Sequence, residues 1–132
     1  PMTLTIITPD AVVYDGKANF FVGRAIDGEF GVLPNHAPMI IALDVAPLRI
    51  DDPEGKKQTF AVFGGFVEIE NNKVSIITPN CENPEAIDIE RAERAKERAE
   101  GRLSNPTPDI DVERAEHALA RALLRLKVTK RI

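Results

Sequence analysis

The most constraining feature of this sequence is a change of hydrophobic pattern near Pro79. Before this point, short apolar runs are separated by frequent turn signals; after it, helix-forming residues occupy nearly every position. All six phenylalanines lie between Phe20 and Phe66, so the large core-filling side chains are confined to the first half. Runs of strands followed by runs of helices indicate an α+β chain. We predict a β-sandwich unit over residues 1–82 and a helical unit over residues 83–132.

Turn signals divide the first half into short strands. We read Asp15-Gly16 and Asp51–Gly55 as turns, and Asn71-Asn72 as a tight hairpin turn with positive φ angles. Many short strands with frequent turns are typical of an antiparallel sandwich or barrel, and we favour the sandwich. The predicted strands are 3–8, 19–24, 47–50, 58–62, 66–70 and 74–78.

The second half contains an internal repeat. After a linker over residues 80–86, the segment Ile87–Ala95 is matched by Ile110–Ala118. Each copy begins with an aspartate, Asp88 or Asp111, that can cap a helix by accepting backbone N–H bonds. A short connection between the two helices predicts an antiparallel helical hairpin.

The expected seam of this hairpin is mostly alanine. Alanine permits close approach but buries little area, so at about 25 cal/mol per Å² the seam stabilises the hairpin weakly. We infer that the hairpin is an arm that can leave a docked position. The predicted stripes are Ala92, Ala95, Ala99 and Leu103 on the first helix and Val112, Ala115, Leu119, Ala122 and Leu126 on the second.

Charge and motifs argue against several classes of protein. No apolar run approaches the roughly 20 residues of a membrane span, and no secretory signal precedes the first strand. Cys81 is alone, which we interpret as a buried or idle thiol, and we expect a cytoplasmic location. No phosphate-binding loop, zinc pair or nucleophile elbow is present, so we expect no catalytic site and no metal site.

Basic residues gather on the second helix although the net charge is −4. Arg114, His117, Arg121 and Arg125 fall three or four residues apart and form one stripe. A solvated face paired with nearby glutamates is one interpretation. However, no acidic residue lies within a turn of Arg121 or Arg125, and two guanidinium groups at this spacing can grip phosphates or carboxylates. Nucleic acid is a weaker candidate because base-stacking aromatics are absent from this half. The basic residues after His117 are Arg121, Arg125, Lys127, Lys130 and Arg131.

The segment Gly28–Pro38 combines glycine, proline and polar residues. Its plain interpretation is a rigid strand connection in which His36 bonds nearby backbone. The functional interpretation is a docking loop that exposes Glu29, Asn35 and His36, because binding residues favour loops on rigid scaffolds.

Four segments together resemble the epsilon subunit of the bacterial rotary (F-type) ATP synthase. They are Ile6–Asp10, Gly28–Pro38, Phe63–Ile69 and Asp109–Leu119, and the resemblance covers essentially the whole chain. It implies a central-stalk subunit without a catalytic site. Its sandwich would dock on the gamma subunit and the c-ring, with Glu29, Asn35 and His36 as the rotor docking loop. Its hairpin would meet acidic parts of the alpha/beta catalytic subunits and inhibit ATP hydrolysis, through Arg114, His117, Arg121, Arg125 and Lys127.

The resemblance also implies a regulatory ligand. Bacillus-type epsilon subunits carry an Ile/Leu-Asp-x-x-Arg-Ala signature for ATP, and this chain has it at Ile87–Ala92. ATP, with or without Mg²⁺, would bind when the arm is closed and so favour the closed state. A second copy of the signature at Ile110–Ala115 lowers its specificity, since it is also an ordinary capped helix start. The implied ATP-binding residues are Glu82, Asp88, Arg91, Ala92, Arg98, Arg121 and Arg125.

These inferences predict a peripheral protein on the cytoplasmic face of the membrane, with no membrane insertion and no nucleic-acid partner. The alternative in another class is a stand-alone β-sandwich binding module with a helical dimerisation arm. An enzyme is the third possibility, and its mark would be turnover by the isolated chain.

Overall fold

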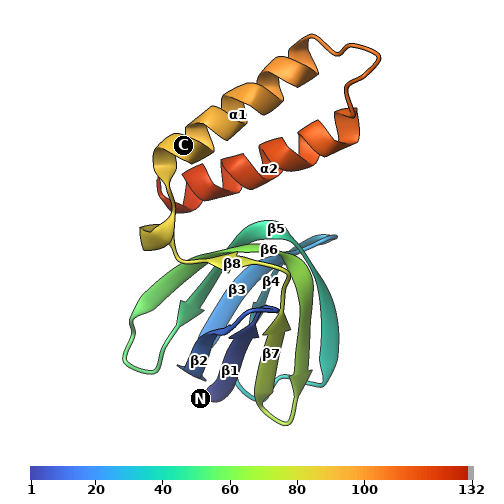
Figure 1. Cartoon of the computed structure of the whole chain (residues 1–132). Helices are drawn as coiled ribbons and strands as arrows, with labels where there is room; N and C mark the ends of the chain where they lie inside the picture. Colours follow the sequence, from blue (N-terminus) through green and yellow to red (C-terminus); the bar gives the residue numbers. More distant parts are fainter. Residues whose placement is uncertain (131–132) are drawn as a thin grey trace. The chain divides into compact units, whose positions relative to one another are not determined.

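The computed structural model describes residues 1–130 and divides into two compact units (Figure 1). The first, the sandwich unit, runs from Pro1 to Asn83, and the second, the hairpin, begins at Pro84. The division lies one residue beyond the boundary that we placed between residues 82 and 83. The predicted fold class is confirmed: strands form the first unit and two helices dominate the second.

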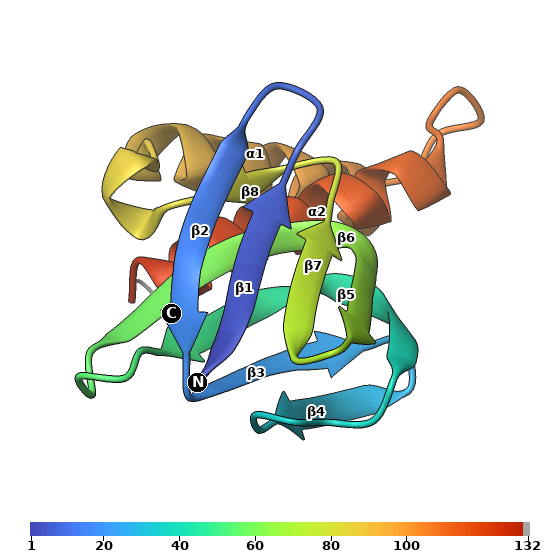
Figure 2. The same cartoon turned by 90° about the horizontal axis from the view of Figure 1, so that it is seen from below.

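The sandwich unit is one folded eight-stranded sheet. Its strand order is β2-β1-β7-β6-β5-β3-β4, with β8 paired to β6. Figure 2 shows β2, β1 and β7 in one layer and β3 and β4 in the other, with β5 and β6 curving between them. All pairs are antiparallel except β1 with β7, which is parallel and departs from the all-antiparallel prediction. The strands are β1 (Met2–Ile7), β2 (Val12–Ala18), β3 (Phe20–Ala25), β4 (Gly28–Val32), β5 (Met39–Asp51), β6 (Lys57–Glu70), β7 (Lys73–Ile77) and β8 (Cys81–Glu82).

The long strands β5 and β6 correct the predicted strand list. The segments 58–62 and 66–70 belong to one 14-residue strand rather than two. Gly64 and Gly65 lie at its centre with φ values of 83° and 108°, which only glycine adopts readily. These two residues bend β6, so that one strand serves both layers. We mistook a bend inside a strand for a break between strands.

Three turn and linker assignments can also be compared with the structure. The Asp15-Gly16 turn is wrong, because both residues lie inside β2 and pair with β1. The Asn71-Asn72 turn is confirmed, with φ values of 52° and 61°. The linker prediction is wrong at its start, because Cys81 and Glu82 pair with β6 as β8.

The core of the sandwich unit is formed by the inward-facing residues of its strands. Leu4 and Ile6 of β1, Phe21 of β3 and Ile76 of β7 are fully buried. Phe21 with Phe30 and Tyr14 with Phe60 form edge-to-face ring pairs, each with 6.0 Å between centroids. The remaining buried members of this core are Met2, Ala18, Val32, Leu43, Leu48, Ile50, Phe60, Val62, Val67, Ile69, Val74 and Cys81.

The second unit is the predicted helical hairpin. A short 3₁₀ turn, η1 (Pro84–Ala86), precedes α1 (Ile89–Ser104) and α2 (Val112–Val128), which lie side by side (Figures 1 and 2). Four of the five alanines of the expected seam are buried, whereas the fifth, Ala95, is only half-buried. Val112 is 42% exposed, against prediction, and Leu124 is buried although it lies outside the predicted stripe. The buried residues are Ala92 and Ala99 of α1 and Ala115, Ala122, Leu124 and Leu126 of α2. Neither helix, over the part of the chain described, has the length and hydropathy of a membrane span.

Candidate functional site

The two copies of the repeat form the same capped helix start. The Asp88 carboxylate accepts a hydrogen bond from the Arg91 backbone N–H at 3.0 Å, and Asp111 accepts one from Arg114 at 3.0 Å. Both caps confirm the role predicted from the repeat. The backbone N–H that each cap accepts belongs to an arginine, Arg91 or Arg114, whose side chain is exposed in the first turn of its helix. The repeat therefore sets one arginine at each end of the hairpin.

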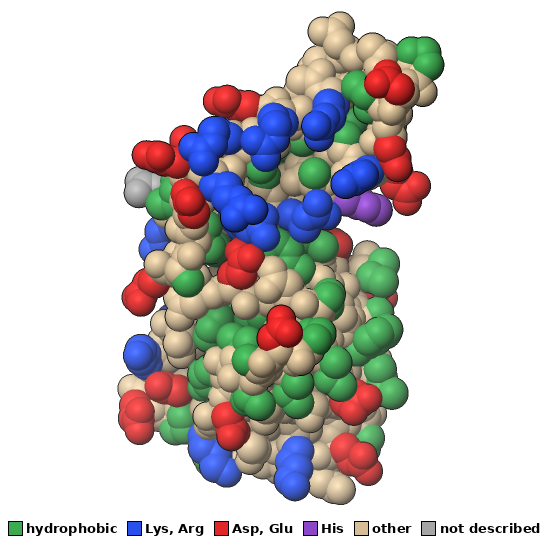
Figure 3. Space-filling view, viewed as in Figure 1, with side chains coloured by type: hydrophobic (Ala, Val, Ile, Leu, Met, Phe, Trp, Pro, Cys, Tyr) green, Lys and Arg blue, Asp and Glu red, His purple; other side chains and the backbone are tan. Residues whose placement is uncertain are grey.

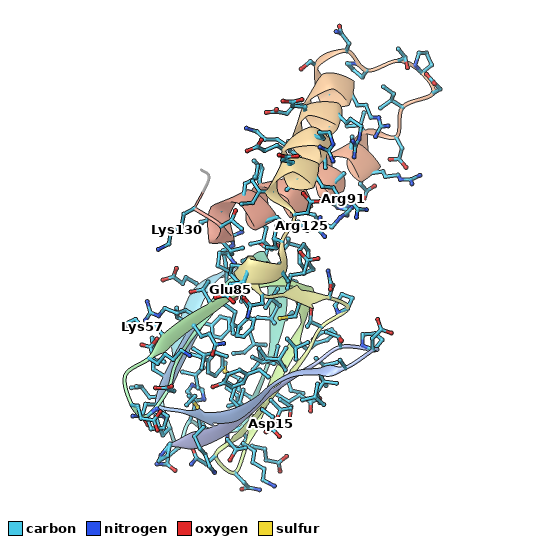
Figure 4. All side chains as sticks on the ribbon, turned by 60° about the vertical axis from the view of Figure 1, so that its left-hand side comes forward. Asp15, Lys57, Glu85, Arg91, Arg125 and Lys130 are labelled. Carbon is cyan, nitrogen blue, oxygen red and sulfur yellow. The ribbon has the colours of Figure 1, made fainter. Side chains whose placement is uncertain are left out.

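The residues implied for ATP binding lie mainly at the end of the hairpin where α1 begins and α2 ends. Arg91 of α1 and Arg125 of α2 are both labelled at this end in Figure 4. Arg91, Arg98 and Arg121 are exposed, Arg125 is half-buried, and Ala92 is buried in the seam. With Asp88, the N-terminal cap of α1, these six residues thus belong to the hairpin, but Arg121 lines a cavity with Arg102 and Arg114 of the opposite end.

Glu82, the seventh implied residue, belongs to the sandwich unit. It lies on β8 opposite Ala61, and its carboxylate accepts a hydrogen bond from the Asn80 side-chain amide at 2.9 Å. The structure describes each unit by itself, so Glu82 is placed by its strand and not by the hairpin.

The residues implied for inhibition lie on α2. At 100° per residue, Arg114, His117, Arg121 and Arg125 fall within one narrow arc of the helix. Lys127 falls on a different side of the helix and does not continue this stripe. The side chains of Arg114, His117, Arg121 and Lys127 are exposed. Figure 3 shows basic side chains gathered over both helices of the hairpin. Arg131, the last basic residue of the tail, lies outside the described residues.

Sequence reasoning missed one arginine of the hairpin. Arg102, near the end of α1, lines a cavity together with Arg114 and Arg121. The signal was present in the repeat, because Arg102 precedes Arg125 by the same 23 residues that separate Ile87 from Ile110 (110 − 87). The predicted repeat covers nine residues of each copy, Ile87–Ala95 and Ile110–Ala118, and ends before this pair.

The rotor docking loop is partly a strand. Gly28–Val32 is β4, so only residues 33–38 connect it to β5. The Asn35 backbone N–H donates to the Asn72 side chain at 2.8 Å, and the His36 ring lies 2.8 Å from the Ala37 carbonyl. Glu29 and His36 line one cavity of about 350 Å³, while Asn35 lies outside it. Apolar residues that we did not predict, Phe30, Met39 and Ile41, complete its wall.

Exposed apolar side chains lie on the wall of this cavity and in the segments that flank β4. Met39, on the wall, is 50% exposed, and Ile26 and Leu33, just before and after β4, are 74% and 63% exposed. Ile40 is 71% exposed but follows Met39 on β5, so it faces the other side of the strand. Contiguous exposed apolar groups mark contact surfaces rather than ordinary solvated faces. Figure 3 shows hydrophobic side chains gathered on the visible face of the sandwich unit.

The free thiol of Cys81 belongs to the packed core of the sandwich unit and not to a reactive site. Cys81 is buried in the core of the sandwich unit. Burial, with a smaller effect of the neighbouring Glu82 carboxylate, raises the pKa of Cys81 to about 12. No group of three His, Cys, Asp or Glu side chains among residues 1–130 is placed to hold a metal ion.

Comparisons with known proteins agree with this architecture. The family model for the beta-sandwich domain of ATP synthase delta/epsilon chains matches residues 1–84, and the model for their long alpha-helix domain matches residues 85–130. The ATP synthase epsilon chain of Brevibacillus brevis is 46% identical over 98% of both chains. That of Desulforamulus reducens is 43% identical over 96% of both.

Solved structures show the same fold. A chain in the cryo-EM structure of Euglena gracilis mitochondrial ATP synthase (OSCP/F1/c-ring) matches with a TM-score of 0.85 and 25% identity, over 98% of this chain and 82% of that one. A chain from the central stalk/c-ring of Tetrahymena thermophila mitochondrial ATP synthase matches with a TM-score of 0.62 and 15% identity, over 97% and 96%. At 15% identity, this second likeness concerns the fold alone.

A β-sandwich domain followed by a helical domain, matched over residues 1–84 and 85–130, places the chain in the delta/epsilon class of ATP synthase chains. Because bacterial epsilon chains are up to 46% identical over nearly the full length, the assignment within this class is direct. The chain belongs to the ATP synthase epsilon chain family.

Proposed function

We propose that this chain is a non-catalytic central-stalk subunit of a proton-translocating ATP synthase that couples rotation and restrains ATP hydrolysis. It would work at the cytoplasmic face of the membrane as a peripheral part of the complex. Family membership and the likeness to a chain of an F1/c-ring assembly support this role. The observation that carries the regulatory part is the exposed set of arginines on a hairpin whose buried residues are mostly alanine.

The sandwich unit is the proposed docking part. Its partners would be the gamma subunit and the c-ring. Glu29, Asn35 and His36 would supply polar contacts beside the exposed apolar residues Leu33 and Met39. This mixture of an apolar patch and a few polar groups is what protein interfaces use.

The hairpin is the proposed inhibitory part. The stripe of Arg114, His117, Arg121 and the half-buried Arg125 would contact acidic segments of the alpha/beta subunits when the arm is extended, together with Lys127 on another side of α2. Arginine suits this contact because its planar guanidinium binds carboxylates with two hydrogen bonds. The weak alanine seam would let the arm rearrange at small cost.

ATP, with or without Mg²⁺, is the proposed ligand of the closed arm. Arg91, Arg98, Arg121 and Arg125 would bind its phosphates, next to Asp88 and the small Ala92. Glu82 of β8 is the remaining residue proposed for ATP binding. A ligand that binds only one state shifts the population toward it.

Deletion of the hairpin tests the inhibitory role. A chain ending at Asn83 should assemble into the complex and raise its rate of ATP hydrolysis, measured on the purified enzyme. A second variant separates the arginines from the hairpin as a whole. It is the full chain with Arg121 and Arg125 both changed to Gln, which keeps the hairpin and should also raise the rate of hydrolysis. Hydrolysis that stays at the wild-type rate with both proteins would refute the inhibitory role.

Calorimetry with the isolated chain tests ATP binding. The double variant Asp88→Ala/Arg91→Ala should lose the heat of ATP binding that the wild type shows.

The alternative function, a stand-alone module that dimerises through the hairpin, predicts instead a concentration-dependent dimer in sedimentation experiments and no co-purification with gamma.

A further inference from the structure

The end of the hairpin where α1 runs into the connection to α2 contains a cavity of about 390 Å³. Arg102 of α1 and Arg114 and Arg121 of α2 line it. Ligand pockets in proteins span about 300–1,000 Å³. This cavity is at the small end of that range, which suits a compact anion better than a whole nucleotide. We call it the loop-end cavity.

The charge around the loop-end cavity favours an anion. Within residues 1–130, no carboxylate lies within ion-pairing distance of Arg102, Arg114 or Arg121. Two carboxylates also line the cavity, so its formal charge is +1. Asp111 is occupied in capping α2, since it accepts the Arg114 backbone N–H. Asp109 accepts the Thr107 hydroxyl, and this bond lowers the pKa of Asp109. Both carboxylates are therefore held by the chain itself, while the three guanidinium groups are available.

The cavity is the repeat mate of the proposed ATP site. A shift of 23 residues, the offset between Ile87 and Ile110 (110 − 87), relates the two helices. Because the two helices are antiparallel neighbours, an approximate two-fold rotation exchanges the two copies of the repeat. Each residue at one end of the hairpin therefore has its repeat mate at the other end. The cavity residues and their mates are Arg114 with Arg91, Arg121 with Arg98, Asp111 with Asp88, Ala115 with Ala92, and Arg102 with Arg125.

We propose that the loop-end cavity is a second anion site, which binds a chain of two or more phosphates through Arg102, Arg114 and Arg121. Guanidinium groups bind phosphate oxygens in pairs of parallel hydrogen bonds, and three of them from two helices can hold adjacent phosphates of one chain. The ligand is either free pyrophosphate or the phosphate chain of a nucleotide whose base stays in solvent. The proposal does not rest on ATP sensing, because the cavity and its charge are present without the first site, although the two sites share Arg121.

Arg114 and Arg91 provide the matched pair of variants for the test. Arg121 is unsuitable because it also belongs to the proposed ATP site. Arg114→Gln removes a cavity charge, and Arg91→Gln removes its repeat mate at the other end. Both side chains are exposed, and glutamine forms helices well, so both proteins should fold.

The experiment is a titration of the full chain with pyrophosphate, followed by NMR at the arginine Nε–Hε groups. We expect saturable shifts at Arg102 and Arg114 in the wild type. Arg114→Gln should weaken the binding seen at Arg102 by about tenfold or more, since a hydrogen bond to a charged group is lost. Arg91→Gln should leave the affinity measured at Arg102 within about twofold.

Parallel titrations identify the source of the phosphates. If ATP saturates the Arg102 signal at lower concentration than pyrophosphate does, the ligand is a nucleotide; the reverse order identifies free pyrophosphate. The proposal is overturned if neither compound gives a saturable shift at Arg102 and Arg114, or if chloride at equal ionic strength or orthophosphate gives the same one. It is also overturned if Arg114→Gln and Arg91→Gln weaken binding at Arg102 equally. ATP-dependent shifts confined to Arg91 and Arg98 would support ATP sensing alone, so the two proposals fail separately.

Discussion

Gly65 occupies a place in β6 where a side chain has no room. Its φ is 108°, and a Cβ built there would lie 2.1 Å from the Ile77 carbonyl oxygen. Gly65→Ala therefore combines backbone strain with a clash against backbone, and we expect it to lower the free energy of unfolding by about 3 kcal/mol or more. Gly101 is the control: it lies in α1, nothing lies within 4 Å of its Cβ position, and Gly101→Ala should stabilise the hairpin by about 1 kcal/mol. Urea unfolding measures both, and a Gly65→Ala protein as stable as the wild type would refute the account of the bend.

Cys81 is expected to be chemically inert in the folded protein. With its pKa raised to about 12, its thiolate fraction at pH 8 is roughly 1,000-fold below that of an ordinary thiol. Alkylation at pH 8 should therefore be slow in buffer and fast in concentrated urea. Burial favours the neutral thiol in the folded state. Its contribution to the free energy of unfolding is therefore complete below the ordinary pKa of 9.0 and is lost as the pH rises toward 12. Equal alkylation rates in buffer and urea would show that β8 opens freely.

At the scale of single residues, the chemistry of the hairpin was readable and the apolar cavity of the sandwich unit was not. Asp88 and Asp111 cap their helices as expected, because capping depends on neighbours three residues away. Phe30 and Met39 meet Glu29 and His36 through pairing of β3, β4, β5 and β6, which no local pattern encodes. The resemblance implied Lys127 for the inhibitory contact together with the stripe residues, but the helical period sets it on another side of α2.

At the scale of elements, the helical caps give the clearest prediction. Asp111→Ala should destabilise α2 by about 1 kcal/mol, because the Arg114 N–H loses its acceptor. Asp111→Asn should retain most of that stability, since asparagine caps nearly as well. Hydrogen exchange at the first turns of α1 and α2 measures the effect on each helix separately. Equal exchange in the Ala and Asn variants would mean that the cap contributes nothing.

The elements also show where sequence patterns lose their power. The helices were found with their correct caps because their period and signals are local. The strand list missed β2, β4 and β8, shortened β5 and split β6. In β2 and β6 the reason is that a bend and a turn use the same residues: Asp15-Gly16 lies within a strand, and Gly64-Gly65 bends one. Only pairing with a neighbouring strand decides between these cases, and pairing is a long-range property.

At the scale of the whole molecule, the unfolding of each of the two units can be followed by a different spectroscopic signal. Tyr14 is the only tyrosine, there is no tryptophan, and Tyr14 packs in the sandwich unit against Phe60. Its fluorescence therefore reports on the sandwich unit, while most of the helical circular dichroism comes from α1 and α2. If the units are independently stable, the two signals should change at different urea concentrations.

The same probes decide where the sandwich unit ends. A fragment of residues 1–83 keeps β8 and should unfold cooperatively, with the Tyr14 transition of the full chain. A fragment of residues 1–80 lacks Cys81, which is buried in the core and pairs with Val62 on β6. It loses that burial and the β8 hydrogen bonds, so we expect it to be less stable than the longer fragment by about 2 kcal/mol. The shorter fragment retains Asn80, whose carbonyl accepts from Phe63 N–H and the Thr78 hydroxyl, so those two bonds are not at issue. Equal stability of the two fragments would mean that β8 belongs to the connection and not to the sheet.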